Sequence, residues 1–485
     1  MAGGIWKTQN KVRPGAYINV KGVPEQQTDT TTGRVLMANG VDYGWGANGV
    51  IELSGDSDFR ALIGVAQTDS KAITIHEALK GAVTVLLVND NAGTKATVAD
   101  EGLPWTLTAK YAGVRGNDLT VSVLKDPTDE TKITVTTLLG TSVVDQQAIK
   151  SDGSVPLLSN DYIDVVTADE TAGPTKLAAL TGKTTYKLTG GTSEKGDITT
   201  LLSDAMETRS YSVVTTAGYP VDTEIHALLA NLVQRMRDDE GYKVTGVVPA
   251  LTTDTKYNSE AITAVVNGVT LMDGTVLDAT TAAAYIAGAS SALDGSASLT
   301  YAVYPDAQDA TPRLSNTAII DNLKAGHLVF SVKRDGDVVI EEDINSLVQF
   351  TDDKPSYFAK NQVIRTIDGI ANLTQTIFEN QFIGKVNNDD TGRDLFKANL
   401  VAQLDTLQNG GSITNFVADD VTVAEGQTKD SIVVDLAVQP NEAMEKLWEI
   451  ARIIRTLIRT SSVPRRPLMV YANSSILMAW CSFSN

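Results

Sequence analysis

The chain has very little of the residue types on which most catalytic and metal sites depend. Its 485 residues include one cysteine, Cys481, and three histidines, His76, His226 and His327. A single cysteine excludes an intrachain disulfide and any metal site built from several cysteines. No H-x-x-x-H, C-x-x-C or EF-hand spacing is present, and His226 and His327 adjoin segments with apolar faces. We therefore expect structural histidines, no metal and no cofactor.

Long apolar runs and positive charge are also scarce. The best apolar run, Ala82–Val88, is far too short to cross a bilayer and predicts a buried strand instead. No N-terminal segment joins a basic region to a long apolar run, so we expect neither a secretory signal nor membrane insertion. The 40 Lys and Arg residues face 59 Asp and Glu residues, and the net charge of −19 argues against a nucleic-acid partner.

What is present is enough apolar material, 42 % of the residues, for several buried cores. Between Gly102 and Asp197 the chain has Thr- and Val-rich stretches of period two, which predict a β-sandwich. From Asp197 onward, apolar strands alternate with helices, one of them near Glu224–Asp239, which indicates a largely parallel, helix-covered sheet. After Phe350, two amphipathic helices flank Gly384–Asn388, and an antiparallel strand pair follows.

Four segments of the last third stand in a specific order. They are an acidic strand end at Ile340–Asp343, K-N-Q-V-I-R at Lys360–Arg365, G-K-V-N at Gly384–Asn387, and V-Q-P-N-E-A-M-E-K at Val438–Lys446. Together with the opening T-Q-N-K-V-R-P-G-A-Y-I-N-V, this order resembles the contractile phage tail sheath protein family, which includes the sheaths of phage-tail-like bacteriocins. The resemblance spans the chain from near its start to about Leu447.

The resemblance implies a multidomain α/β fold. It consists of a subtilisin-like α/β core with an inserted β-sandwich, a C-terminal α+β domain and terminal arms. The expected boundaries are 1–20 for the N-terminal arm, 21–101 for the first part of the core, 102–192 for the β-sandwich, 193–349 for the non-catalytic subtilisin-like domain, 350–447 for the C-terminal domain and 448–485 for an atypical tail.

A subtilisin-like domain raises the question of proteolysis. A Ser-His-Asp triad needs a histidine placed to take the proton of the serine. The two G-T-S strings, Gly140–Ser142 and Gly191–Ser193, lack the small-residue helix start that follows the family nucleophile. The glycine-rich Thr189–Gly196 does not match the phosphate-loop pattern either. We therefore predict a structural protein and not an enzyme.

The resemblance also implies a function. The chain would be a subunit that forms stacked rings around an inner tail tube and contracts to drive the tube through the target cell envelope. Its partners would be further copies of itself, the tail tube protein, and the baseplate and tail terminator proteins. We expect assembly in the host cytoplasm and a place in the virion tail or in a phage-tail-like particle.

Three sets of residues are candidates for these contacts. The first is an arm strand that exchanges between subunits: Tyr17, Ile18, Asn19 and Val20. The second is the basic side of a helix from Asn441 to Thr460, which either faces the tube or solvates a packed helix: Lys446, Arg452, Arg455 and Arg459. The third is an acidic run that forms either a solvated edge or a charged contact with a neighbour or the tube: Glu341, Glu342 and Asp343.

The chain departs from the family pattern after Leu447. Sheath proteins of this kind close with a short apolar strand, whereas this sequence continues with helical periodicity over Trp448–Thr460 and two further apolar runs. Leu468–Ala472 could supply a replacement strand, or the ending could come from a reading-frame disruption. The sequence leaves both open.

A second class of function is a surface adhesin or another cell-surface binding protein, whose β-sandwich contacts cell-wall sugars. Its aromatic residues Trp105, Tyr111, Tyr162 and Tyr186 would then stack on sugar rings, although so few aromatics more often belong to a core. Electron microscopy of the purified protein separates the two classes, because sheath subunits polymerise into tubes and an adhesin stays monodisperse.

Overall fold

The computed structural model describes residues 3–4, 16–17, 32–167, 173–179, 183–251 and 257–448. The chain up to Ala443 belongs to one compact unit, and the residues from Met444 onward belong to a second one. The first two strands of the larger unit, β1 (Gly3–Gly4) and β2 (Ala16–Tyr17), pair with each other in parallel.

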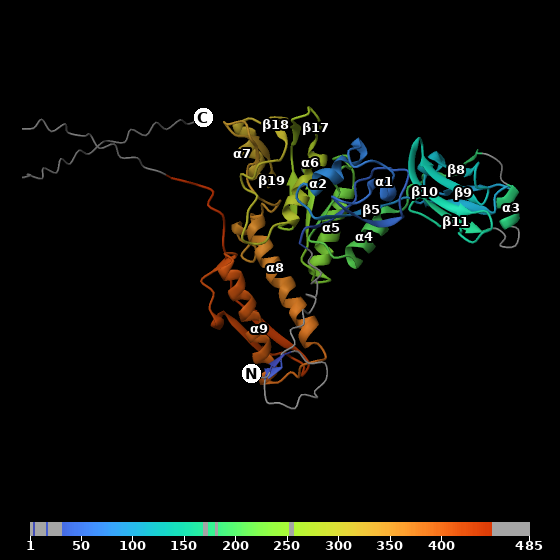
Figure 1. Ribbon diagram of the computed structural model, residues 1–485. Helices are drawn as coiled ribbons and strands as arrows, with labels where there is room; N and C mark the ends of the chain where they lie inside the picture. Colours follow the sequence, from blue (N-terminus) through green and yellow to red (C-terminus); the bar gives the residue numbers. More distant parts are fainter. Residues whose placement is uncertain are drawn as a thin grey trace, which may run out of the picture. The chain divides into compact units, whose positions relative to one another are not determined.

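A seven-stranded mixed sheet lies at the centre of the larger unit (Figure 1). Its strands stand in the order β19 (His327–Leu328), β15 (Ile262–Val265), β14 (Thr245–Pro249), β13 (Val213–Thr215), β3 (Arg34–Met37), β5 (Thr84–Asn89) and β4 (Gly49–Ser54). Neighbouring strands are parallel, except that β4 pairs antiparallel with β5 at one edge. Parallel neighbours need crossover connections, and helices supply several of them.

Alternate residues of each strand bury the two faces of this sheet against different helices. Val35 and Met37 contribute to a core with α2 (Ile73–Leu79) and α6 (Ala279–Ser291). Leu36 contributes to the core on the opposite face, with α4 (Ile198–Thr208) and α5 (Ile225–Asp238). Because side chains alternate along a strand, a run such as Val35–Met37 is buried on both sides.

Shorter elements complete this central region. They are α1 (Phe59–Ile63), the 3-10 turn η1 (Ser70–Ala72), the sheet of β17 (Val276–Leu277), β16 (Gly268–Leu271) and β18 (Ala307–Thr311), the helix α7 (Asn316–Lys324), and the hairpin of β20 (Phe330–Val332) and β21 (Val338–Ile340).

Two antiparallel sheets form a β-sandwich between β5 and α4 in the sequence. One contains β10 (Ser142–Lys150), β9 (Lys132–Leu139), β8 (Leu119–Lys125) and β12 (Lys183–Lys187), in that order. The other contains β11 (Ile163–Thr167), β7 (Trp105–Ala112) and β6 (Lys95–Ala99). The 3-10 turn η2 (Val114–Asp118) and α3 (Gly173–Ala179) lie between strands. Burial alternates along β9, as expected for a strand with one face in a core.

Trp45, which precedes β4, closes the core of the sandwich. It is 1 % exposed, lies edge-on to Tyr111 with ring centroids 5.5 Å apart, and donates its indole N–H to the carbonyl of Ala61 at 2.8 Å. Asn91 adds a second link, because its Nδ2 donates to the carbonyls of Gly46 and Ala112. The sandwich is therefore packed on the central region and not only connected to it through the chain.

The last part of the larger unit combines two long helices with two strand pairs. The helical elements are the 3-10 turn η3 (Ser356–Ala359), α8 (Asn361–Ile377), the π-helical turn η4 (Phe378–Phe382) and α9 (Asp390–Asn409). The remaining elements are β22 (Ile413–Thr414), the 3-10 turn η5 (Ala418–Asp420), β23 (Val421–Glu425), β24 (Ile432–Leu436) and β25 (Gln439–Pro440). Phe378 and Phe382 both pack edge-on against Phe396, which joins α8 to α9.

The broad organisation expected from the sequence is confirmed. The protein is a multidomain α/β protein with a β-sandwich and a mixed, mainly parallel sheet. The apolar run Ala82–Val88 gives the fully buried strand β5, and α8 and α9 flank Gly384–Asn388. The antiparallel pair after them is β23 with β24.

The helix expected from Asn441 is wrong over its first eight residues. Asn441–Trp448 is not helical, and the side chains of Met444, Leu447 and Trp448 are 98 %, 84 % and 90 % exposed. A helix in water gains most of its stability from packing an apolar face, and these side chains bury none. The remainder of the expected helix, with Arg452, Arg455 and Arg459, lies outside the described residues.

Candidate assembly surfaces and the α8 joint

The acidic run after β21 does not form an exposed strand edge throughout. Asp343 is 1 % exposed and accepts hydrogen bonds from the backbone N–H of Leu299 at 3.0 Å and from Asn361 Nδ2 at 2.8 Å. Arg365 Nη2 lies 2.6 Å from its Oδ2. The prediction of an inter-subunit contact therefore does not hold for Asp343, because burial leaves its carboxylate no surface to offer.

The Arg365 guanidinium keeps this buried carboxylate ionised. Burial by itself would raise the pKa of Asp343, but the charge of Arg365 and the hydrogen bonds lower it overall below its usual value. Arg365 Nη2 also donates to the carbonyl of Ala297 at 2.9 Å. The other two acidic residues are only half-buried: Glu342 pairs with Lys360, and Glu341 accepts a hydrogen bond from Ser331.

A second buried ion pair joins α5 to α8. Arg237 donates to Asp368 through two parallel hydrogen bonds, Nη1 to Oδ2 at 2.6 Å and Nη2 to Oδ1 at 2.8 Å. The two side chains are 7 % and 9 % exposed. Burial works to lower the pKa of Arg237, but the hydrogen bonds and the charge of Asp368 raise it overall. At Asp368, burial outweighs the attraction of Arg237 and raises the pKa of the carboxyl group.

A third contact continues along the same helix. Asn372 exchanges two hydrogen bonds with the backbone of Lys243, at 2.9 Å and 2.8 Å. Asn361, Arg365, Asp368 and Asn372 are spaced i, i+4, i+7 and i+11, which places them on one face of α8. We call these four residues with their partners Asp343, Arg237 and Lys243 the α8 joint.

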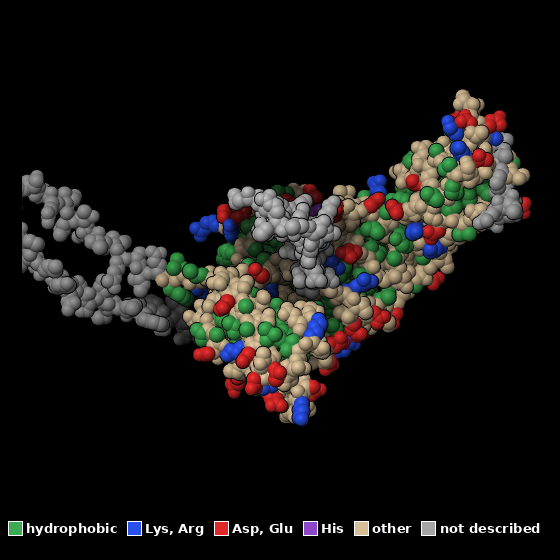
Figure 2. Space-filling view, turned by 60° about the horizontal axis from the view of Figure 1, so that its bottom comes forward, with side chains coloured by type: hydrophobic (Ala, Val, Ile, Leu, Met, Phe, Trp, Pro, Cys, Tyr) green, Lys and Arg blue, Asp and Glu red, His purple; other side chains and the backbone are tan. Residues whose placement is uncertain are grey.

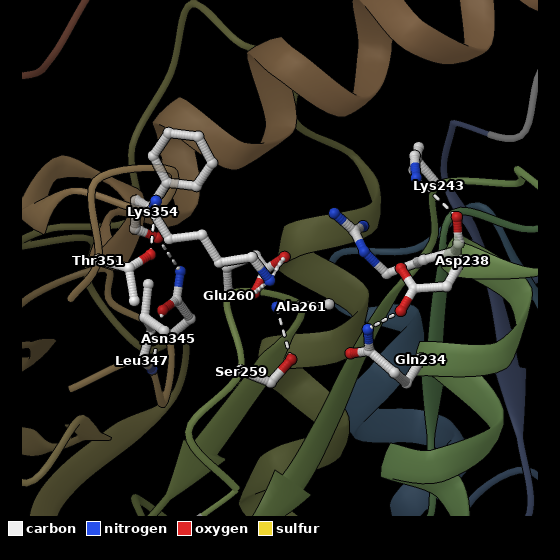
Figure 3. Close-up of polar contacts among 12 residues, drawn as sticks. Gln234, Asp238, Lys243, Ser259, Glu260, Ala261, Asn345, Leu347, Thr351 and Lys354 are labelled. Atoms are coloured by element: carbon white, nitrogen blue, oxygen red, sulfur yellow. Dashed lines mark hydrogen bonds and ion pairs between the residues drawn. The ribbon is translucent and has the colours of Figure 1, made fainter. Parts of the chain in front are cut away.

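Figure 3 shows further polar contacts beside the α8 joint. Lys354 Nζ lies 2.8 Å and 2.9 Å from the two carboxylate oxygens of Glu260, and Asn345 Nδ2 donates to the carbonyl of Phe358 at 2.8 Å. Partial burial works to raise the pKa of Glu260, but the hydrogen bond from Lys354 and further contacts lower it overall. The segment between β21 and α8 is thus tied to the start of β15.

Sequence reasoning named Asp343 and the motif that ends at Arg365, but it did not identify Arg237, Asp368 or Asn372. One signal was available. Asp368 follows the buried Ile364 by one helical turn, so it lies on the buried face of an amphipathic helix. A carboxylate in that position needs a cationic partner, because a lone buried charge is too costly.

The histidines occupy structural positions. His226 is fully buried, with Nδ1 2.7 Å from Thr216 Oγ1 and Nε2 2.9 Å from the carbonyl of Pro220. Burial lowers the pKa of His226. His327 Nδ1 lies 3.0 Å from Asn322 Oδ1, and His76 lies 3.6 Å from Glu77. Within the described ranges, no three His, Cys, Asp or Glu side chains are placed to share a metal ion.

The hairpin of β23 and β24 has two open edges. In the part of the chain that the structure describes, neither strand pairs with a further strand on its outer side. One face carries apolar side chains against the C-terminal core: Val421, Val423, Ile432, Val434 and Leu436. The opposite face is exposed, and Val433 there is 55 % exposed. A two-stranded sheet is marginal by itself, and its free edges can accept another strand.

The remaining candidates lie at the two ends of the chain. Tyr17 belongs to β2, whereas Ile18, Asn19 and Val20 lie outside the described residues. Lys446 is exposed in the non-helical segment before Trp448. Figure 2 shows many acidic side chains on one face of the molecule, with fewer basic ones between them, as the net charge leads one to expect. None of the described helices combines the length and the apolar character that crossing a bilayer requires.

Three models of phage tail sheath domains match consecutive parts of the chain. They are the β-sandwich domain over residues 89–194, the central domain over 191–346 and the C-terminal domain over 353–453. A curated relative, the phage-like element PBSX protein XkdK of Bacillus subtilis, is 32 % identical over 470 residues. The alignment covers 92 % of this chain and 99 % of the relative.

Two solved structures are similar over most of their length. The sheath tail protein of Desulfitobacterium hafniense is 33 % identical, with a TM-score of 0.71, over 88 % of this chain and 96 % of that one. The sheath tail protein of Listeria innocua is 30 % identical, with a TM-score of 0.73, over 85 % of this chain and 92 % of that one.

Sequence and fold together define a structural component of a phage tail or a phage-like particle. The chain belongs to the phage tail sheath protein family. It is a subunit of a contractile tail sheath, of a phage or of a related contractile injection system, and not an enzyme. The match of the sandwich to a sheath domain leaves the adhesin alternative without support.

Proposed function

We propose that this subunit polymerises as stacked rings around an inner tail tube and contracts to drive the tube through the envelope of a target cell. The observation that carries this proposal is the β23–β24 hairpin, whose inner face is packed while no other described strand pairs with its outer edges. A folded domain that keeps two free strand edges is suited to receive strands from other subunits.

The strands that fill these edges come from neighbouring subunits. The arm residues Tyr17, Ile18, Asn19 and Val20 of one subunit add to a hairpin edge of the next, because main-chain pairing needs only an extended donor segment. A C-terminal strand such as Leu468–Ala472 fills the second edge. Each arm is part of one subunit and pairs with the sheet of a neighbour. The arms therefore keep the lattice continuous while the folded cores change position.

Contraction is then a rearrangement of folded cores about the arms. The α8 joint supports this view, because its buried ion pairs hold the central region and α8 together and resist bending there. Hinge motion therefore occurs in the arms. The free energy lies in the subunit interfaces, which explains why no nucleotide site is needed.

Contacts with the tube and the tail ends involve exposed charge. Lys446, Arg452, Arg455 and Arg459 face the tube, and Glu341 and Glu342 contribute to charged contacts with neighbours. Baseplate and tail terminator proteins bind the two ends of the sheath. Assembly takes place in the host cytoplasm, and the product is a virion tail or a bacteriocin-like particle.

The finer description of the fold belongs to the same proposal. The helix-covered, mainly parallel sheet supports a subtilisin-like central domain without activity, at about 193–349 with 21–101. The sandwich at 102–192, the C-terminal domain at 350–447, the arm at 1–20 and the tail at 448–485 complete the division.

Electron microscopy of the purified chain, alone and with tube protein, tests the proposed function. We expect helical tubes, and with tube protein we expect tubes of defined length. The double variant Arg452→Glu/Arg455→Glu should keep its fold and lose tube-templated assembly, because rim ion pairs with the tube are reversed in sign. A chain that stays monodisperse under all conditions would refute polymerisation, and normal templating by the variant would refute the tube-facing assignment.

A further inference from the structure

The central region carries an open groove that contains no residue of the α8 joint or of the β23–β24 hairpin. It has a volume of about 630 Å³ and lies between η1 with α2 on one side and the β16–β17 hairpin on the other. Met272 and Val276 line it and are 70 % and 61 % exposed. Such large apolar side chains are normally covered when they gather at a concave surface, so this groove has the character of an interaction surface.

The floor and one border of the groove are rigid. Glu77 is fully buried in the floor, accepts a hydrogen bond from the Tyr304 hydroxyl at 2.5 Å and pairs with Lys80 at 2.8 Å. The bordering segment from Tyr301 to Asp306 contains two non-glycine residues with positive φ, Tyr301 at 60° and Asp306 at 61°. Tyr301 is 58 % exposed. Backbone of this kind persists only where the surroundings fix it, and it is often found at binding surfaces.

The exposed charge at the groove is mainly negative and disfavours pairing of the groove with itself, because the lining Lys80 is 10 % exposed and is paired with the buried Glu77. Asp69, Asp273 and Asp306 line it and are exposed. Two copies of this surface facing each other would bring these carboxylates together, and like charges at an interface repel. The partner surface must therefore be a different one, with an apolar centre and a cation. A repeated contact between two different surfaces of the same chain generates a ring if its rotation closes and an open helical array if it does not.

Helix α7 offers such a surface on the same domain. None of its nine residues is buried, which is unusual for a helix of a folded domain. Ile320 is 41 % exposed, and Lys324 is exposed in the last turn. The helix lies against the edge strand β19, where Asn322 is hydrogen-bonded to His327, so it does not fill the groove of its own chain.

We propose that the groove of one subunit receives helix α7 of a neighbouring subunit. Ile320 packs against Met272 and Val276, and Lys324 meets the carboxylates of Asp273 or Asp306. This is the helix-in-groove mode of recognition, with one apolar anchor and one charged contact that sets the register. The inference rests on the proposed polymerisation and adds to it a lateral contact between central domains, separate from the exchange of arms.

Two single variants and a matched control test the contact. Met272→Glu and Ile320→Glu each place a carboxylate in the apolar centre, and we expect the protein concentration needed for polymerisation to rise at least tenfold, while the thermal unfolding of the monomer is unchanged. Leu158→Glu changes a side chain of the sandwich that is 63 % exposed, close to the 70 % of Met272, and this variant should polymerise like the unmodified chain. Normal polymerisation of Met272→Glu overturns the inference.

Cross-linking identifies the occupant. In a Cys481→Ser background, subunits with Met272→Cys are mixed with subunits with Ile320→Cys, polymerised and oxidised. A disulfide between the two supports α7 as the occupant, and polymers that form normally without this disulfide, or with a disulfide between two copies of position 272, overturn it. If the unmodified chain forms no polymer, the proposed function itself fails. If it forms tubes that Met272→Glu leaves unaffected, only the groove contact fails.

Discussion

The α8 joint ties the first long helix of the C-terminal part to the central region, and the β23–β24 hairpin belongs to the same C-terminal part. The two treat their polar groups in opposite ways. In the joint, Asp343, Arg237 and Asp368 are buried, Arg365 is 12 % exposed, and all four are paired within the chain. In the hairpin, no further described strand pairs with either outer edge, and Val433 is exposed. The K-N-Q-V-I-R segment therefore stabilises the folded subunit. In the function proposed above, strands of other subunits complete the hairpin.

The largest effect is expected from breaking the joint at Arg365. Arg365→Ala leaves the carboxylate of Asp343 buried without its cation, and such a loss costs about 3–5 kcal/mol of the free energy of unfolding. Equilibrium unfolding in urea measures it. Lys360→Ala is the matched control, because the pair of Lys360 with Glu342 is about a fifth exposed and contributes at most about 1 kcal/mol. Equal losses of unfolding free energy in the two variants would show that the ion pair of Arg365 with Asp343 contributes no more than the partly exposed pair of Lys360 with Glu342.

A double-mutant cycle at the second ion pair sharpens the same comparison. Arg237→Met alone should destabilise by about 3–5 kcal/mol, because Asp368 is then buried and uncompensated. Arg237→Met together with Asp368→Leu should recover more than half of this loss, since an apolar pair can replace a buried ion pair. Additive losses in the urea transitions would mean that the two side chains act independently, against the bidentate geometry seen here.

The sequence predicted the helices and strands better than it predicted the contacts between them. The elements were predictable because periodicity is local: the apolar run at Ala82–Val88 gives β5, and the spacing over Glu224–Asp239 gives α5. The pairing of Arg237 with Asp368 joins residues 131 positions apart, and no local pattern encodes that distance. Asp343 was assigned to a surface because a charged strand end is usually solvated, and only the fold brings Arg365 and Asn361 to it.

The helix expected from Asn441 is wrong over Asn441–Trp448 for a related reason. The helical periodicity of the sequence runs over Trp448–Thr460, almost all of which lies outside the described residues, and Met444, Leu447 and Trp448 bury no face in the structure. Periodicity shows that a face exists and not that a partner for it is present.

A smaller effect concerns pH. Burial lowers the pKa of His226 in the folded state, whereas the unfolded chain binds a proton near pH 6.5. The unfolded state therefore holds more protons below that pH, and stability is lost as the pH falls through 6.5 toward the lower pKa of the folded state. The slope is at most about 1.4 kcal/mol per pH unit.

His226→Gln should remove this part of the pH dependence between pH 7 and 5.5 in urea unfolding, although it lowers stability at every pH through lost packing. Leu229→Ala is the control, because it removes buried packing from the same helix without changing a titratable group, and it should keep the slope of the unmodified chain. If the free energy of unfolding of His226→Gln falls with pH as steeply as that of the unmodified chain, other groups cause the acid sensitivity.

The most direct test of the division between maintenance and assembly is sedimentation velocity of a chain without residues 1–20, under conditions in which the full chain polymerises. The account predicts a single species of monomer size with the same urea midpoint as the full chain, because the arm completes a neighbour's hairpin and not its own core. Polymers of normal size from the truncated chain, or a large loss of monomer stability, would contradict the account.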